Sequence, residues 1–128
     1  MAISFNQDSV WNLKPIRPEA VRKDVSAMLL EGEQIEMAFQ TIRDQLVFTD
    51  RRLIAVDVQG LTGTRKTFTV MPYTRIQYFS LETPGFAEIF ADSELTLFFS
   101  NGFKARFEFR GGVDLGKLGR VIARYALN

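Results

Sequence analysis

The chain of 128 residues contains no cysteine and no histidine. Without cysteine it has no disulfide, no zinc–thiolate site and no thiol nucleophile. Without histidine it lacks the usual general base near neutral pH and the commonest ligand of transition metals. No constellation of carboxylates or lysines stands out in their place. We therefore predict no catalytic residues, no metal site, no cofactor and no enzymatic activity.

Long apolar runs and an excess of one charge are also missing. No window approaches the roughly 20 apolar residues that span a bilayer, and residues 1–18 lack the basic start and apolar stretch of a secretory signal. The 16 basic and 15 acidic residues leave a net charge of +1, so no global field favours nucleic acid or anionic lipid. We expect a cytoplasmic protein that binds no nucleic acid, and we expect no membrane contact.

The composition is that of a folded domain, with 46% apolar and 24% charged residues. Residues 1–17 have no clear period and hold the only tryptophan, Trp11. They form either an irregular arm on the domain's own surface or an arm that docks on a neighbouring copy. We place the domain itself at residues 18–128.

A helix is predicted over residues 18–30, because Pro18 suits a first turn and Gly32 follows as a stop. Its apolar stripe consists of Val21, Val25, Met28 and Leu29. Another helix is predicted over residues 114–127. Gly116 and Gly119 lie inside it, where each costs about 1 kcal/mol relative to alanine, so we expect this helix to pack unusually close to a sheet.

Between the two helices the apolar period changes to two, which is typical of half-buried strands. Short connections separate predicted strands at residues 35–41, 46–49, 53–58, 66–71 and 74–82. Asn101-Gly102 lies between two further alternating stretches, residues 94–99 and 103–109, and predicts a hairpin. Residues 86–92 fit either an irregular connection or the start of a strand. Periodicity thus indicates an antiparallel β domain with a terminal helix.

Several blocks at fixed spacing resemble the bacterial pleckstrin-homology (PH) domain family. They are residues 39–44, 47–54, 57–63, 72–73 and 79–83. The resemblance runs from about Leu29 to the C-terminus; residues 86–92 look longer than the family's pattern, and the arm has no counterpart in it. It implies a mainly β, PH-like barrel of seven antiparallel strands in two near-orthogonal sheets (4+3), capped by the C-terminal α-helix, with the N-terminal helix as an addition.

The resemblance also implies an assembly habit more than an activity, because many small single-domain members form ring-shaped homo-oligomers. Eukaryotic PH domains that bind phosphoinositides use a basic loop between the first two strands. Here that connection is Arg43-Asp44-Gln45, which is too short to hold a multiply charged headgroup.

The basic pair Arg65-Lys66 is the better candidate for anion binding, because it follows a glycine-bounded loop at residues 60–64 whose amides can face an anion. The alternative is a solvated loop in which the glycines only shape a turn.

Some strands are apolar on both faces, although a small barrel has a single interior. The candidate contacts between copies are Trp11, Phe79, Leu81 and Phe98. Their second cover is the N-terminal helix, the arm or another subunit; the alternative is that the chain's own helix covers all of them. We predict a non-enzymatic, homo-oligomeric scaffold or protein-interaction module, possessing a further protein partner that the sequence does not identify. The alternative is a peripheral lipid- or anion-binding domain that uses Arg65 and Lys66.

Overall fold

The computed structural model describes residues 9–83 and 92–127, with side chains from residue 12 onward. Its strands are β1 (Ser9–Ile16), β2 (Ile35–Gln40), β3 (Gln45–Thr49), β4 (Arg52–Gln59), β5 (Arg65–Pro72), β6 (Ile76–Glu82), β7 (Asp92–Phe99) and β8 (Lys104–Arg110). Its helices are α1 (Lys23–Ser26) and α2 (Leu115–Ala126), with 3-10 turns η1 (Pro18–Ala20) and η2 (Tyr73–Arg75). The seven predicted strands and the C-terminal helix are confirmed. Most of the undecided segment 86–92 lies outside the described residues.

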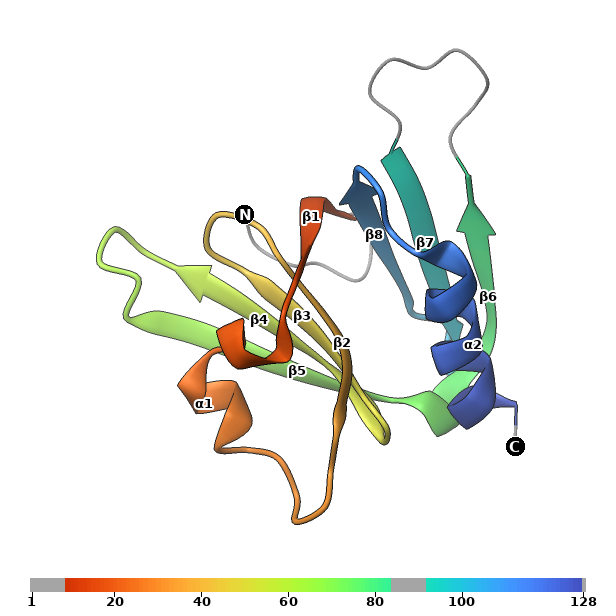
Figure 1. Ribbon diagram of the computed structural model, residues 1–128, viewed down its shortest axis with the longest axis horizontal. Helices are drawn as coiled ribbons and strands as arrows, with labels where there is room; N and C mark the ends of the chain where they lie inside the picture. The colour runs from red at the N-terminus through yellow and green to blue at the C-terminus, as the bar shows by residue number, and fades with distance from the viewer. Residues whose placement is uncertain (1–8, 84–91, 128) are drawn as a thin grey trace.

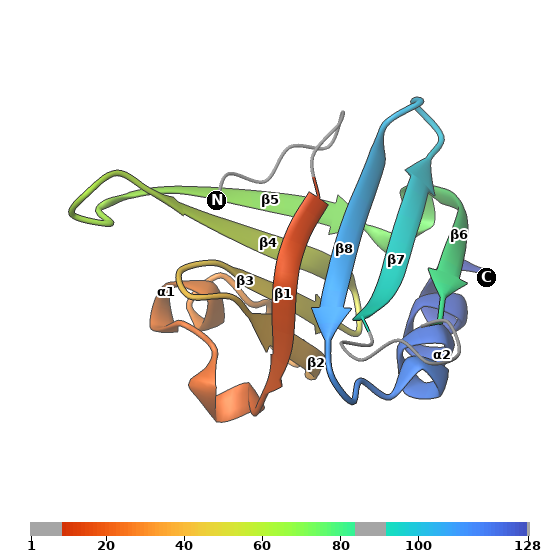
Figure 2. The same cartoon turned by 90° about the horizontal axis from the view of Figure 1, so that it is seen from above.

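The strands form one sheet in the order β5-β4-β3-β2-β1-β8-β7-β6, and not the two separate sheets that we predicted. The expected antiparallel groups of four (β2–β5) and three (β6–β8) are both present. Strand β1 joins them, because it pairs antiparallel with β2 through Lys14–Ile16 and parallel with β8 between Ser9 and Leu13. In Figures 1 and 2 the four-stranded part runs across the three-stranded part, with β1 between them.

Strand β1 bends where it changes partner. Asn12 has a φ of +59°, the one positive φ of a non-glycine residue among those described, and the register with β8 shifts between Val10 and Leu13. Such a bulge turns a strand and breaks its side-chain alternation. The prediction of an irregular arm is therefore wrong for residues 9–16, whose period the bulge conceals.

The predicted helix 18–30 is also wrong, because this segment contains only η1 and the single turn α1. Val21 and Arg22 between them are extended. A side chain of β3 provides the reason: Gln45 Oε1 accepts a hydrogen bond from the Arg22 amide (3.0 Å), and Gln45 Nε2 donates to the Ala20 carbonyl (3.2 Å). The sheet thus satisfies backbone groups that a continuous helix would pair internally.

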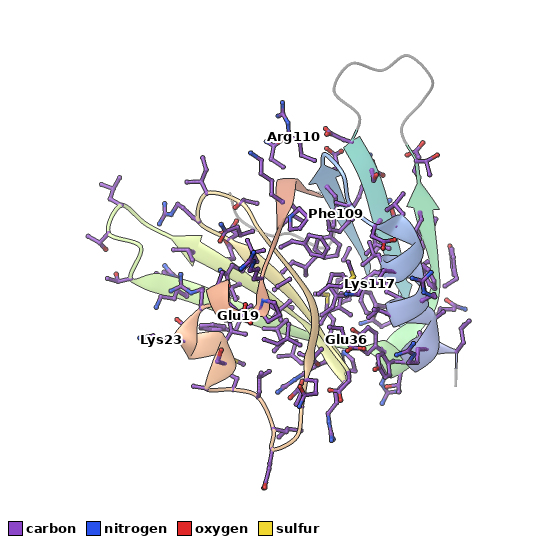
Figure 3. The ribbon with its side chains drawn as sticks, viewed as in Figure 1. Glu19, Lys23, Glu36, Phe109, Arg110 and Lys117 are labelled. Atoms are coloured by element: carbon purple, nitrogen blue, oxygen red, sulfur yellow. The ribbon has the colours of Figure 1, made fainter. Side chains whose placement is uncertain are left out.

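Both faces of the sheet bury apolar side chains. The inner cluster lies between the two strand groups and α2, and it includes Leu13, Phe39, Phe48, Tyr73, Leu97, Phe107, Phe109 and Leu118. Figure 3 shows Phe109 directed into this interior while its neighbour Arg110 points away. The outer cluster covers the back of β2–β5 with the segment around η1 and α1: Val21, Val25, Ala38, Val47, Ile54, Val56 and Val58. The chain's own N-terminal segment thus supplies one of the covers that we expected.

A buried ion pair fixes this N-terminal cover to the sheet. The Glu33 carboxylate, whose side chain is fully buried, receives two hydrogen bonds of 3.0 Å from the Arg52 guanidinium and one of 2.6 Å from Thr49 Oγ1. Burial alone would raise the pKa of Glu33, but the hydrogen bonds from Arg52, Thr49 and the Leu30 amide outweigh it and lower the pKa to about 2.

Helix α2 packs on the inner cluster through Leu118, Val121 and Ile122, and Asp114 caps its N-terminus by accepting from the Lys117 amide (3.0 Å). A Cβ atom on Gly119 would stand 3.2 Å from Leu81 Cδ1 of β6, whereas one on Gly116 would meet only the side chains of Arg120 and Asp114. The predicted close approach to the sheet is therefore confirmed at Gly119 and wrong at Gly116.

The two helix glycines should respond oppositely to substitution. Gly116→Ala should stabilise the fold by about 1 kcal/mol, because it gains helix propensity and meets only flexible side-chain ends. Gly119→Leu should destabilise it by about 1–3 kcal/mol, because the new side chain must displace Leu81. Urea unfolding of the parent and both variants measures this, and equal effects at the two positions would contradict the assigned packing.

Acid should weaken the Glu33 anchor. Because the pKa of Glu33 is lower in the folded chain than its usual value, its contribution to stability is complete above about pH 5 and is lost as the pH falls towards 2. Glu33→Gln should cost about 3 kcal/mol at neutral pH, since it leaves Arg52 without its partner, and should lose less further stability on acidification than the parent. Urea midpoints measured between pH 7 and pH 3 test this, with the exposed neighbour Glu31→Gln as the control. The same pH slope in parent and Glu33→Gln would refute the role of the ion pair.

Candidate functional site

Two neighbouring turns, here called the hairpin tips, carry the most exposed aliphatic side chains of the described residues. They are the β2–β3 turn (residues 41–44) and the β4–β5 turn (residues 60–64), with Ile42 and Leu61 fully exposed. The Arg43 guanidinium donates from Nη2 to the Gly60 carbonyl (2.5 Å), which ties the two tips together.

A groove of about 750 Å³ runs beside the β2–β3 tip. Its lining includes three basic residues from three elements, Lys14 of β1, Arg43 of the tip and Arg110 at the end of β8, and no acidic residue. Arg110 Nη1 lies 3.3 Å from Asn12 Oδ1, which it donates to across the β1 bulge. The groove therefore presents positive charge beside the exposed Ile42.

Two buried carboxylates lie beneath the tips. Asp44 Oδ1 accepts a hydrogen bond from the Val58 amide (2.9 Å), and Asp57 Oδ2 accepts one from Gln59 Nε2 (2.8 Å). Burial raises the pKa of Asp44, and the nearby Asp57 adds to the effect against the hydrogen bond from Val58. Asp44 thus braces the short turn from inside, which agrees with a connection too tight to surround a headgroup.

The predicted anion pair does not converge on one site. Lys66 Nζ forms an ion pair of 3.0 Å with Asp24, which Arg22 also contacts at 3.0 Å. The hydrogen bond from Arg22, with a smaller one from Lys66, lowers the pKa of Asp24 to about 2. Arg65 is exposed and adjacent in the same strand, so the two side chains point to opposite faces of β5.

The predicted contact residues between copies fall into two groups. Phe79 and Leu81 pack against the inner cluster beside α2, so the chain's own helix covers them in part. Phe98 points to the outer face, where its ring stacks on Tyr78 with a centroid distance of 4.2 Å and an interplanar angle of 10°. The Trp11 side chain lies outside the described residues. We did not predict Tyr78 as a contact, although its cross-strand position opposite Phe98 is the signal that pairs them.

Tyr78 and Phe98 form the centre of what we call the outer aromatic patch. Tyr78 is 56% exposed and Phe98 is half-buried. Beside them on the same face, Arg106 forms an ion pair of 2.6 Å with Glu94. Burial raises the pKa of Glu108, and the neighbouring Glu94 adds to this. The patch is thus an aromatic centre with charged residues at one end.

Residues 9–83 and 92–127 contain no group of three or more acidic side chains that could hold a metal ion. They also contain no helix that is long and apolar enough to cross a membrane.

The chain is similar to two proteins that are described as uncharacterized. The chain is 45% identical over 98 residues to the uncharacterized protein YjqA of Bacillus subtilis (strain 168), which covers 77% of each protein. It is 27% identical over 103 residues to the uncharacterized protein YozO of the same organism, covering 80% of this chain and 87% of YozO.

Solved structures share the fold over most of their length. A protein of Shewanella loihica PV-4 with a pleckstrin-homology domain superposes with a TM-score of 0.77 at 30% identity, covering 90% of this chain and 97% of that one. A pleckstrin homology domain of Shewanella amazonensis SB2B gives a TM-score of 0.65 at 33% identity, covering 88% and 90%. Residues 4–126 match the family model described as the bacterial PH domain. With this match and the bridged sheet capped by α2, the chain belongs to the bacterial PH domain family, as its sequence blocks predicted.

Proposed function

We propose that this chain is a non-enzymatic interaction module of the cytoplasm that binds copies of itself and offers the assembly to a further protein partner. The observation that carries the proposal is the outer aromatic patch beside the free edge of β6. A stacked, exposed Tyr78–Phe98 pair on a sheet face that no described element covers is the kind of centre that protein interfaces bury. The charged Arg106–Glu94 pair resembles the polar rim of such an interface.

The sheet also ends in two different free strands. Among the described strands, β5 and β6 each have a neighbour on one side only, and an edge strand can present backbone groups for pairing on its other side. If the edge or face of β6 meets a different surface of the next copy, the contact is head-to-tail. Head-to-tail contacts close into a ring when the rotation between copies permits it. This agrees with the ring assembly that the family resemblance implies.

The absence of histidine and cysteine supports a role without catalysis, because it removes the usual bases and nucleophiles of acid–base and covalent chemistry. The uncharacterized relatives and the PH-like fold are consistent with a binding module. PH-like folds, like other widespread folds, acquire their function from a surface and not from the fold itself.

The assembly can be measured by light scattering on the purified full chain. The parent should be an oligomer at micromolar concentration, and Tyr78→Ser/Phe98→Ser should shift it to a monomer while leaving the circular dichroism spectrum unchanged. Leu30→Ser is the matched control, because Leu30 is 57% exposed, close to the 56% of Tyr78, but lies on the N-terminal segment. It should leave the oligomer intact.

A monodisperse monomer in the parent would end the self-assembly proposal. If Leu30→Ser dissociates the oligomer as strongly as Tyr78→Ser/Phe98→Ser does, the contact between copies does not lie at the outer aromatic patch. If the patch variant unfolds, the lysine substitution Ser80→Lys on the exposed side of β6 tests the same edge with a smaller change, since edge lysines oppose strand pairing.

The hairpin tips favour a second candidate, a peripheral lipid- or anion-binding domain. The sequence pointed to Arg65 and Lys66, but Lys66 is already paired with Asp24. Fully exposed Ile42 and Leu61 beside the basic groove form a better surface for an anionic bilayer. Apolar side chains can enter the headgroup region while nearby cations contact lipid phosphates.

Vesicle co-sedimentation tests the second candidate. If it holds, the chain should pellet with vesicles of phosphatidylglycerol and phosphatidylcholine and not with phosphatidylcholine alone. Ile42→Ser and Leu61→Ser should each weaken binding about tenfold, since each removes an aliphatic side chain from the bilayer. Leu30→Ser is again the control. If only Arg65→Ala/Lys66→Ala loses vesicle binding, the binding site is the predicted pair Arg65 and Lys66 and not the hairpin tips. If the parent chain does not pellet with vesicles, this function is excluded.

A further inference from the structure

A separate cavity lies at the corner where the end of the four-stranded group meets the three-stranded group. Its volume is about 530 Å³, within the range of roughly 300–1,000 Å³ that is usual for small-molecule pockets. The end of β5, the turn η2 and the β7–β8 hairpin form its walls. It is separate from the hairpin tips, because the two cavities share no lining residue.

Hydrogen bonds fix the walls of this cavity, here called the corner pocket. The Ser100 amide donates to the Arg75 carbonyl (3.0 Å), which joins the β7–β8 turn to η2. The Phe99 amide donates to the Phe103 carbonyl (2.8 Å), and Asn101 Oδ1 accepts from the Phe103 amide (3.1 Å). The chain's own hydrogen bonds therefore hold the pocket walls in place.

The walls are mostly apolar, and part of that apolar surface faces solvent. They include Val70, Met71, Pro72, Phe99 and Phe103. Val70 is 39% exposed and Phe103 is 49% exposed. These are two of the seven large hydrophobic side chains that the described residues expose, and both line this one pocket. A ligand with an apolar body would remove their surface from water.

Arg75 is the single charged residue among those that line the pocket. Arg22, Arg52 and Arg106 each have a carboxylate partner, but no carboxylate of the described residues lies within ion-pair distance of Arg75. A guanidinium pairs with a carboxylate through two parallel hydrogen bonds. One such group suits a single negative charge, while a multiply charged phosphate ester would require more donors.

From these features we propose that the corner pocket binds an apolar monocarboxylate, such as a medium-chain fatty acid, with its hydrocarbon against Val70, Phe99 and Phe103 and its carboxylate on Arg75. The site is independent of the proposed self-assembly. Phe98, at the centre of the outer aromatic patch, points to the outer face of β7. The next residue, Phe99, points to the inner face and lines the corner pocket.

Sodium decanoate is the probe for this site, titrated into the full chain below its aggregation concentration. Calorimetry should give saturable binding, and amide shifts in NMR should concentrate at residues 69–75 and 99–103. Each methylene added from octanoate to decanoate should tighten binding about fourfold, the factor expected for burying one methylene. Decyltrimethylammonium, with a similar chain and the opposite charge, should bind much more weakly.

Two variants separate the charged and apolar parts of the site. Arg75→Gln should weaken decanoate binding about tenfold, as expected for the loss of one charge-assisted contact, and should remove the preference over decyltrimethylammonium. Val70→Asp should abolish decanoate binding, because it places a carboxylate in the apolar wall of an exposed edge strand. Arg51→Gln, an exposed arginine of the β3–β4 turn outside the lining, is the matched control and should bind like the parent.

Absence of saturable binding, or shifts centred outside the pocket, would overturn the assignment. So would an Arg75→Gln variant that binds decanoate as tightly as the Arg51→Gln control. If Val70→Asp alters the circular dichroism spectrum, Phe103→Ser on the hairpin turn provides the second test of the apolar wall. Light scattering on the same samples shows whether assembly changes, so failure here and failure of self-assembly are distinguishable.

Discussion

Strand β1 is the constraint on which the arrangement of the whole sheet depends. It is paired on both sides, with β2 near its end and with β8 near its start, so it holds two strand groups that otherwise cross each other. The bulge at Asn12 allows one strand to follow both directions. Leu13 follows the bulge directly and is completely buried in the inner cluster. Without β1 the backbone edges of β2 and β8 would lie exposed above an open core.

Thr49 performs a similar joining role among the covers of the sheet. Its hydroxyl donates to Glu33 of the N-terminal cover and accepts from the amides of the β3–β4 turn, while its carbonyl accepts from the Tyr73 hydroxyl (2.7 Å). Burial raises the pKa of Tyr73, which therefore remains a donor, and its ring packs against Tyr125 of α2 at 5.2 Å. The Tyr125 hydroxyl in turn donates to Glu36 of β2 (2.9 Å). Thr49 thus contacts the N-terminal cover directly and is linked to α2 through Tyr73.

Sequence patterns predicted the elements whose side chains alternate regularly, and they failed where another part of the chain decides the conformation. Strands β7 and β8 alternate between buried and more exposed side chains, β3 and β4 are buried runs between short turns, and Gly119 correctly indicated close helix packing. The period of β1 is broken by its bulge, and helix 18–30 is interrupted by hydrogen bonds from Gln45, which is far away in the sequence. The ion pair that occupies Lys66 was missed for the same reason, since Asp24 is 42 residues away in the sequence.

The outer aromatic patch and the corner pocket lie where the N-terminal segment and α2 do not cover the sheet. The N-terminal segment lies over the back of β2–β5, and α2 lies beside β6 on the inner side, so neither contacts the outer face of β6 and β7. Among the residues that the structure describes, Tyr78 and Phe98 therefore have only each other as aromatic partners. The corner pocket has a related origin, because β5 and β6 are the two ends of the sheet and do not pair across the corner. Because this corner is open, Val70 and Phe103 line the cavity and remain 39% and 49% exposed.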